Sequence, residues 1–249
     1  MHPSVDHEAF DRAARFLRPA KKVAALTGAG ISAESGLATF RGAGGLWEGQ
    51  RVEDVATPRA FQRDPVLVWR FYNLRRANLA AVKPNPGHHA LVELEKRLDN
   101  NFTLVTQNVD GLHQSAGSHN VLEIHGAIRR VRCSGCDLVA DRGVDALPEL
   151  PRCETCGELL RPDVVWFEEA LPEDIWGRAV EAVEACDCFL VIGTSAVVYP
   201  AAGLIDVARL TGADVIEINL EPSAASARAN VVLLGPSGTT LPELVKRVW

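Results

Sequence analysis

The distribution of apolar residues along the chain predicts a parallel sheet with helices on both faces. Short apolar runs typical of buried strands alternate with longer segments whose apolar residues recur at helical spacing. Because strands buried on both faces are a feature of parallel sheets, the pattern predicts an α/β fold whose ligands bind at the carboxyl ends of the strands. The predicted strands are residues 23–26, 102–105, 121–124, 188–192, 214–220 and 231–234, and the predicted helices are residues 6–17, 65–82, 86–98, 172–185, 200–210 and 241–249.

A glycine-rich turn follows the first predicted strand. Gly28 and Gly30 permit a tight turn and a close approach of the backbone to a ligand, and residues 32–36 are predicted to begin a short helix. A strand, a glycine turn and a helix N-terminus together suit a pyrophosphate, although such a turn can also be purely structural. No second strand ending in an acidic residue follows about 20 residues later. Residues 39–47 instead predict an inserted loop.

Two Cys-x-x-Cys pairs interrupt the α/β pattern, and 16 residues separate them. This is the spacing of a zinc ribbon, and four thiolates complete a tetrahedral shell, so we expect one structural Zn²⁺. Two disulfides are the alternative, but no export signal is visible. Cys186 and Cys188 flank the start of a predicted strand and are expected to be buried thiols. The expected metal ligands are Cys133, Cys136, Cys153 and Cys156.

Composition narrows the class of protein. The chain of 249 residues is 47% hydrophobic and 23% charged, which is ordinary for a globular enzyme. A net charge of −6 gives no general basic field for nucleic acid, and residues 137–152 between the cysteine pairs hold no aromatic side chain for base stacking. The apolar runs are too short to span a membrane, and we expect a cytoplasmic location.

Polar residues cluster where several predicted strands end. The segment TQNVDGLH occupies residues 106–113, His125-Gly126 follows the strand at 121–124, and GTS occupies residues 193–195. Ordinary loop chemistry also favours Asn, Asp and Gly, so each cluster alone has a structural alternative. A lone histidine is usually structural too, but at a strand end on the ligand edge its near-neutral pKa suits a general base.

In combination, these motifs resemble the sirtuin family of NAD-dependent protein lysine deacylases, over roughly residues 20–249. The resemblance rests on GAGISAESG with TFR, TQNVDGLH, the HG pair, GTS, INLE and GPSGTTLPEL, in this order. It implies a Rossmann-like NAD-binding domain with a smaller inserted zinc-ribbon and helical module. The implied parts are residues 1–41, 84–128 and 170–249 for NAD binding, 42–83 for a cofactor loop and helical module, and 129–169 for the zinc-binding module.

The resemblance also assigns roles. It makes His125 the general base that deprotonates a ribose hydroxyl after nicotinamide leaves, and it makes 2′-O-acyl-ADP-ribose a product. Asn108 and Asp110 would position nicotinamide, Asn219 the adenosine ribose and Ser237 the adenine. The implied cofactor-binding residues are Gly28, Ala29, Gly30, Ile31, Ala33, Phe40, Arg41, Trp47, Gln107, Asn108, Val109, Asp110, Gly193, Thr194, Ser195, Asn219, Leu220, Glu221 and Ser237.

One helix carries the residues that bear on the acyl group. Tyr72 and Arg75 fall on one largely apolar face of the helix predicted from residue 65. Arg75 is either an arginine that reaches out from the edge of this stripe or a bidentate clamp for a carboxylate. Tyr-x-x-Arg resembles the sirtuins that remove succinyl and malonyl groups, and Ala56 stands where that class has a small residue. The resemblance implies removal of these groups and of acetyl; a plain deacetylase is the alternative.

The segment RPDVVWF at residues 161–167 resembles the family's substrate-peptide segment. The resemblance implies that Val165 and Phe167 contact an acyl-lysine peptide, which would add as a strand between this segment and residues 196–199. Glu168 stands where the family commonly has glycine. If that position requires a positive φ, its side chain costs about 1 kcal/mol and brings a negative charge to the peptide groove.

Two other classes of protein are alternatives. An NAD-linked oxidoreductase would transfer hydride and would need neither the double Cys-x-x-Cys nor a peptide groove. A zinc-ribbon binding module with a degenerate nucleotide site would not need the intact set of Arg41, Asn108, Asp110 and His125. The sequence therefore favours the deacylase.

Overall fold

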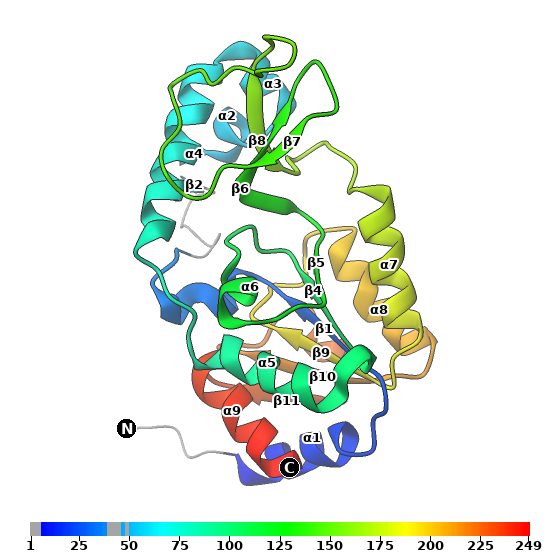
Figure 1. Cartoon of the computed structure of the whole chain (residues 1–249). Coiled ribbons are helices and arrows are strands. Elements are labelled where there is room, and N and C mark those ends of the chain that lie inside the picture. The colour runs from blue at the N-terminus through cyan, green and yellow to red at the C-terminus, as the bar shows by residue number, and fades with distance from the viewer. Residues whose placement is uncertain (1–5, 39–45, 48–49) are drawn as a thin grey trace.

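A six-stranded parallel sheet forms the centre of the protein, as predicted, and its strands lie in the order β11-β10-β9-β1-β4-β5. The computed structural model describes residues 6–38, 46–47 and 50–249 (Figure 1). Phe40, Arg41 and the side chain of Trp47 lie outside the described residues. The strands are β1 (Val23–Thr27), β4 (Phe102–Thr106), β5 (Val121–Glu123), β9 (Cys188–Ile192), β10 (Asp214–Asn219) and β11 (Val231–Leu234).

Helices cover both faces of this sheet because successive strand residues point to opposite sides. In β1, Val23 and Ala25 belong to one apolar cluster, whereas Ala24 and Leu26 belong to another. The first cluster is closed by α1 (His7–Leu17), α5 (Pro86–Leu98) and α9 (Ser237–Val248), and the second by α7 (Glu173–Glu184) and α8 (Leu204–Leu210). Short helices complete this part: η1 (Ala29–Ser35), η2 (Asp99–Asn101), α6 (Leu112–Ala116), η3 (Ala201–Gly203) and η4 (Ser226–Arg228).

A second, smaller unit, which we call the small module (residues 52–80 and 126–166), lies beyond the carboxyl ends of the sheet (Figure 1). It packs helices from one stretch of chain against an antiparallel sheet, ordered β7-β6-β8, from another. Next to it, β2 (Leu46–Trp47) pairs with β3 (Gln50–Arg51). The elements of the small module are α2 (Val52–Val55), α3 (Pro58–Arg63), α4 (Pro65–Ala80), β6 (Gly126–Cys133), β7 (Val139–Asp141) and β8 (Leu160–Val164).

Arg76 joins the two halves of the small module, a role that the sequence did not indicate. Its side chain is almost completely buried, and its guanidinium donates to the carbonyl oxygens of Ile128 at 2.6 Å and of Arg142 and Asp145 at 3.0 Å each. Burial lowers the pKa of Arg76 from its usual value. The hydrogen bonds of this cation thus go to backbone carbonyl oxygens, and the negative charges of Asp141 and Asp145 partly oppose the lowering of its pKa.

Three helix starts differ from the predictions. The α-helix α8 begins at Leu204, four residues later than predicted, and the 3₁₀ helix η3 precedes it. The turn after β1 is a 3₁₀ helix that already begins at Ala29, and α9 begins at Ser237, four residues earlier than predicted. The Gly238 N–H donates to the Glu34 carboxylate, so a distant side chain satisfies the first turn of α9 where the local Gly and Pro residues favoured a loop. Within the described part of the chain, no helix is long and apolar enough to cross a membrane.

Candidate active site

A cavity of about 710 Å³ lies between the strand ends and the small module. Its volume is in the range of cofactor and substrate sites. The cavity is lined by His125 and by the predicted cofactor- and substrate-binding residues. This holds, with one exception, for every such residue whose side chain the structure describes. Ile31 is that exception, because its side chain is fully buried in the apolar cluster of the first sheet face.

Glycines bring the ends of β1 and β9 into direct backbone contact. The Gly30 N–H donates to the Gly193 carbonyl at 2.7 Å, and the Gly28 N–H to the Ile192 carbonyl at 3.0 Å. A Cβ on Gly30 would lie 2.6 Å from the Gly193 oxygen, so a larger residue does not fit. The chain runs from β1 toward β5 on one side and from β9 toward β11 on the other, so this contact lies at the topological switch point, where α/β sheets bind nucleotides.

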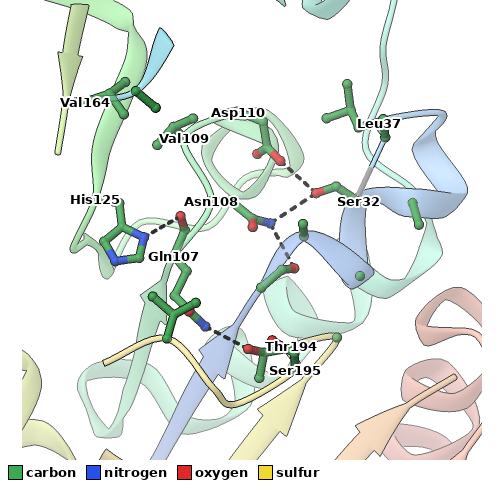
Figure 2. A pocket seen from close by; sticks show the side chains of 18 of the residues that line it. Ser32, Leu37, Gln107, Asn108, Val109, Asp110, His125, Val164, Thr194 and Ser195 are labelled. Atoms are coloured by element: carbon green, nitrogen blue, oxygen red, sulfur yellow. Dashed lines mark hydrogen bonds between the residues drawn. The ribbon is translucent and has the colours of Figure 1, made fainter. Parts of the chain in front are cut away.

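A polar network lines the cavity beside this turn (Figure 2). The Asn108 amide donates to the Gly28 carbonyl and to Ser32 Oγ, both at 3.2 Å, and the Ser32 hydroxyl donates to Asp110 at 2.8 Å. Burial raises the pKa of Asp110, while hydrogen bonds from the Leu112 N–H and Ser32 oppose that rise. These side chains are therefore fixed before any ligand arrives. Sequence reasoning missed Ser32, which lay inside the glycine motif without a role.

Two buried histidines, His88 and His113, lie behind this network. Their rings are 5.0 Å apart, and His113 Nε2 lies 2.9 Å from the Thr27 hydroxyl at the end of β1. His88 Nε2 lies 3.4 Å from Ser32 Oγ. Burial lowers the pKa of His88 to about 4 and that of His113 to about 3, so both rings are neutral at neutral pH. Sequence reasoning had no signal for His88, which belongs to α5.

His125 presents one ring nitrogen to the backbone and the other to the cavity. Its Nδ1 lies 3.0 Å from the Gln107 carbonyl oxygen (Figure 2). A carbonyl oxygen can only accept, so Nδ1 carries the proton and Nε2 keeps a free lone pair in the neutral ring. Burial lowers the pKa of His125, although the hydrogen bond to Gln107 partly opposes this. The geometry suits a general base at neutral pH.

The α4 side chains Tyr72 and Arg75 face the same cavity from the small module. Tyr72 is buried in the wall of the cavity, and its hydroxyl oxygen accepts a 2.9 Å hydrogen bond from Trp166 Nε1. Burial raises the pKa of Tyr72, and the positive charge of Arg75 partly offsets that rise. The small side chain of Ala56 is buried in the same wall of the cavity. The Ala56 carbonyl oxygen accepts a hydrogen bond from the Phe167 N–H at 3.0 Å. A hydroxyl and a guanidinium thus meet at one apolar wall.

Glu168 adopts a positive φ of 73°, so the condition under which we expected a strain cost at this position is met. Its carboxylate lies 3.2 Å from the Arg59 guanidinium of α3, and both side chains are at least half exposed. Glu168 also lines the cavity, next to Phe167 and Val165. A strained backbone and a negative charge therefore lie at the edge of the predicted peptide groove.

The four cysteines of the two pairs come together at the end of the small module, and their sulfur atoms all lie within 4.8 Å of one another. The Cys133–Cys156 and Cys136–Cys153 pairs are 3.4 and 3.7 Å apart, too long for disulfides. A zinc–sulfur distance of about 2.3 Å gives a tetrahedron edge of about 3.8 Å. The site therefore fits one Zn²⁺ with no open position. Cys186 and Cys188 are buried elsewhere, beside and within β9.

The glycine contact at the switch point, the preset polar network and the four-cysteine site define a dinucleotide-binding α/β protein with a structural metal module. The model of the Sir2 family matches residues 28–200. The chain therefore belongs to the Sir2 family, whose members use NAD.

Individual relatives cover nearly the whole chain. It is 51% identical over 237 residues to NAD-dependent protein deacylase 2 of Pyrobaculum aerophilum, which covers 94% of each chain. A solved complex of a Sir2 homologue with NAD is 44% identical, with a TM-score of 0.90 over 96% of this chain and 93% of that one. A structure of Sir2 bound to acetylated peptide is 27% identical, with a TM-score of 0.84 over 95% and 97%.

Proposed function

We propose that this protein is an NAD-dependent protein lysine deacylase that removes acetyl groups and the acidic succinyl and malonyl groups. Family membership and the deacylase relatives support the reaction. The observation that carries the proposal is that the free nitrogen of His125, the network around Asn108 and the acyl-facing pair of Tyr72 and Arg75 share one cavity. An NAD molecule and an acyl-lysine side chain would meet there.

Each group of residues lining the cavity has its own role in the proposed reaction. The closely packed turns at Gly28 and Gly193 line the cavity and would hold the pyrophosphate, and Asn108 with Asp110 would orient the nicotinamide. Bound NAD would supply the ribose carbon that bonds to the acyl oxygen while the bond to nicotinamide breaks. One water would be consumed when the lysine amine is released, so the products would be lysine, nicotinamide and 2′-O-acyl-ADP-ribose. His125 would take a ribose hydroxyl proton on Nε2, because its Nδ1 is held by Gln107.

Arg75 supports the preference for acidic acyl groups. A guanidinium beside a phenol hydroxyl can bind a terminal carboxylate, and that carboxylate would be the only charged part of the acyl chain. A neutral acetyl group is too short to carry such a contact. The small Ala56 side chain leaves room for a longer chain.

The test compares kcat/KM on matched succinyl-lysine and acetyl-lysine peptides with NAD. Arg75→Met should lower the succinyl value roughly 10- to 100-fold, as for the loss of a hydrogen bond to a charged group, and leave the acetyl value within about twofold. Arg70→Met is the matched control, since Arg70 lies on the same helix but pairs with Glu149 on the surface. If acetyl is preferred and Arg75→Met changes neither value, the enzyme is a plain deacetylase.

A further inference from the structure

Trp166 makes a directional contact with Tyr72 that bears on what the Tyr72 hydroxyl can do. Trp166 Nε1 lies 2.9 Å from the Tyr72 oxygen. An indole N–H can only donate, so the phenol oxygen is the acceptor and the phenol proton is not used in this bond. Among the residues that the structure describes, Trp166 is the one hydrogen-bond partner of the Tyr72 hydroxyl. Its proton therefore remains to be donated to a group in the cavity that Tyr72 lines.

The indole ring is itself held firmly. Trp166 is only 3% exposed, and the Arg161 guanidinium carbon lies 3.5 Å from the centre of its ring. Arg161 is fixed in turn by Glu169, whose carboxylate accepts from both terminal nitrogens at 2.6 and 2.8 Å. Glu169 also accepts from the Trp166 backbone N–H at 2.8 Å. Because these contacts hold the ring in place, the direction of its N–H is set before a substrate binds.

We propose that Trp166 is a positioning residue for acidic acyl groups. By occupying one side of the Tyr72 oxygen, its indole N–H directs the Tyr72 O–H toward the carboxylate of a bound succinyl or malonyl group, beside Arg75. The inference rests on the proposed acyl specificity and adds a residue to it. Preorganising a donor lowers the cost of ordering it on binding, so the effect belongs to substrates that carry an acceptor there. Burial raises the pKa of Tyr72, so its hydroxyl keeps its proton at neutral pH.

A purely structural role for Trp166 makes a different prediction. Phe61, Tyr72 and Trp166 pack together in the core of the small module, so loosening the indole could disturb the whole cavity wall. Such a disturbance would affect acetyl and succinyl substrates alike. Positioning through Tyr72 would affect the succinyl substrate alone, and only while the Tyr72 hydroxyl is present.

The experiment is a double-mutant cycle on the 249-residue protein with NAD, using Trp166→Phe, Tyr72→Phe and the double variant. Trp166→Phe should lower kcat/KM for the succinyl peptide roughly 3- to 10-fold, as for one neutral hydrogen bond, and the acetyl value by less than about twofold. In the Tyr72→Phe background the same change should cause no further loss for succinyl. Equal losses on both peptides, or losses that simply multiply, would overturn the proposal.

Different outcomes distinguish a failure of the positioning role of Trp166 from a failure of the proposed preference for acidic acyl groups. If Arg75→Met and Tyr72→Phe abolish the succinyl preference but Trp166→Phe does not change it, only the positioning role fails. If none of these variants changes the preference, both fail. Should Trp166→Phe not fold, Glu169→Gln weakens the hold on the ring and should produce a smaller loss confined to succinyl. An equal loss on both peptides would overturn the proposal.

Discussion

The Nδ1 atom of His125 lies 3.0 Å from the carbonyl oxygen of Gln107, and this hydrogen bond leaves Nε2 as the nitrogen that can accept a proton. Only the neutral ring can act as the proposed base, and burial lowers the His125 pKa. Activity should therefore be lost on the acid side with an apparent pKa below 6.5, the usual value for histidine. Nicotinamide release followed by deacylation, measured from pH 5 to 9, checks this.

His125→Ala should lower deacylation by about 10²- to 10⁴-fold, the usual contribution of a general base. The exposed His119 offers a matched control, and His119→Ala should keep the wild-type pH profile. Full deacylation by His125→Ala would remove His125 from the mechanism.

The pair His88 and His113 predicts how stability depends on pH. Their folded-state pKa values of about 4 and about 3 lie below the unfolded value near 6.5, so between these limits the unfolded chain binds more protons. The two histidines should make their whole contribution to the free energy of unfolding above pH 6.5. As the pH is lowered below 6.5, this free energy should fall by on the order of 1 kcal/mol per histidine and pH unit. Urea titrations at pH 7.5, 6.5 and 5.5 measure the slope.

His113→Gln supplies the comparison. The variant can be more or less stable than the wild type overall. Because it lacks one of the two buried histidines, its free energy of unfolding should change less with pH between pH 6.5 and 5.5. Equal stability of the wild type at pH 7.5 and 5.5 would mean that the two rings are not held neutral by burial.

The four-cysteine site predicts a metal-dependent stability. Cys153→Ser should lose bound zinc and lower the thermal unfolding midpoint, because metal binding to such a site contributes directly to folding. Cys186→Ser is the control, since Cys186 is buried far from the cluster and should keep one zinc per chain. Metal analysis of the purified variants, together with thermal unfolding, decides the matter. A zinc-free wild type with an unchanged midpoint would refute the structural role.

Glu168 predicts a stabilising substitution at the edge of the cavity. Its φ of 73° is easily reached by glycine but strained for other residues, so Glu168→Gly should raise the free energy of unfolding by about 1 kcal/mol. Glu168→Ala separates the causes, because it also removes the ion pair with Arg59 but keeps the strain. The prediction fails if the Gly and Ala variants have equal midpoints in urea.

Much of the fold could be predicted because buried parallel strands give continuous apolar runs, and because Asp64-Pro65 and Asn85-Pro86 mark helix starts directly. The roles of side chains that depend on partners distant in the sequence could not be predicted. Arg75 and Arg76 are adjacent on α4, yet only the carbonyls around residues 128–145 determine that Arg76 is the buried one. Local chemistry likewise gave no indication of the roles of Ser32, His88 and Trp166.

The small module draws its core from two stretches of chain separated by α5, β4 and β5. Trp69 of α4 donates to the Leu160 carbonyl of β8 across 91 residues. Neither stretch alone can bury that core, so the module cannot be isolated as one continuous fragment. During folding, the cysteine-bearing stretch can close around its metal locally, while the helices must wait for a long loop to close. We therefore expect slow, sheet-dependent assembly of the cavity wall that carries Tyr72 and Arg75, after both the metal site and the central strands have formed.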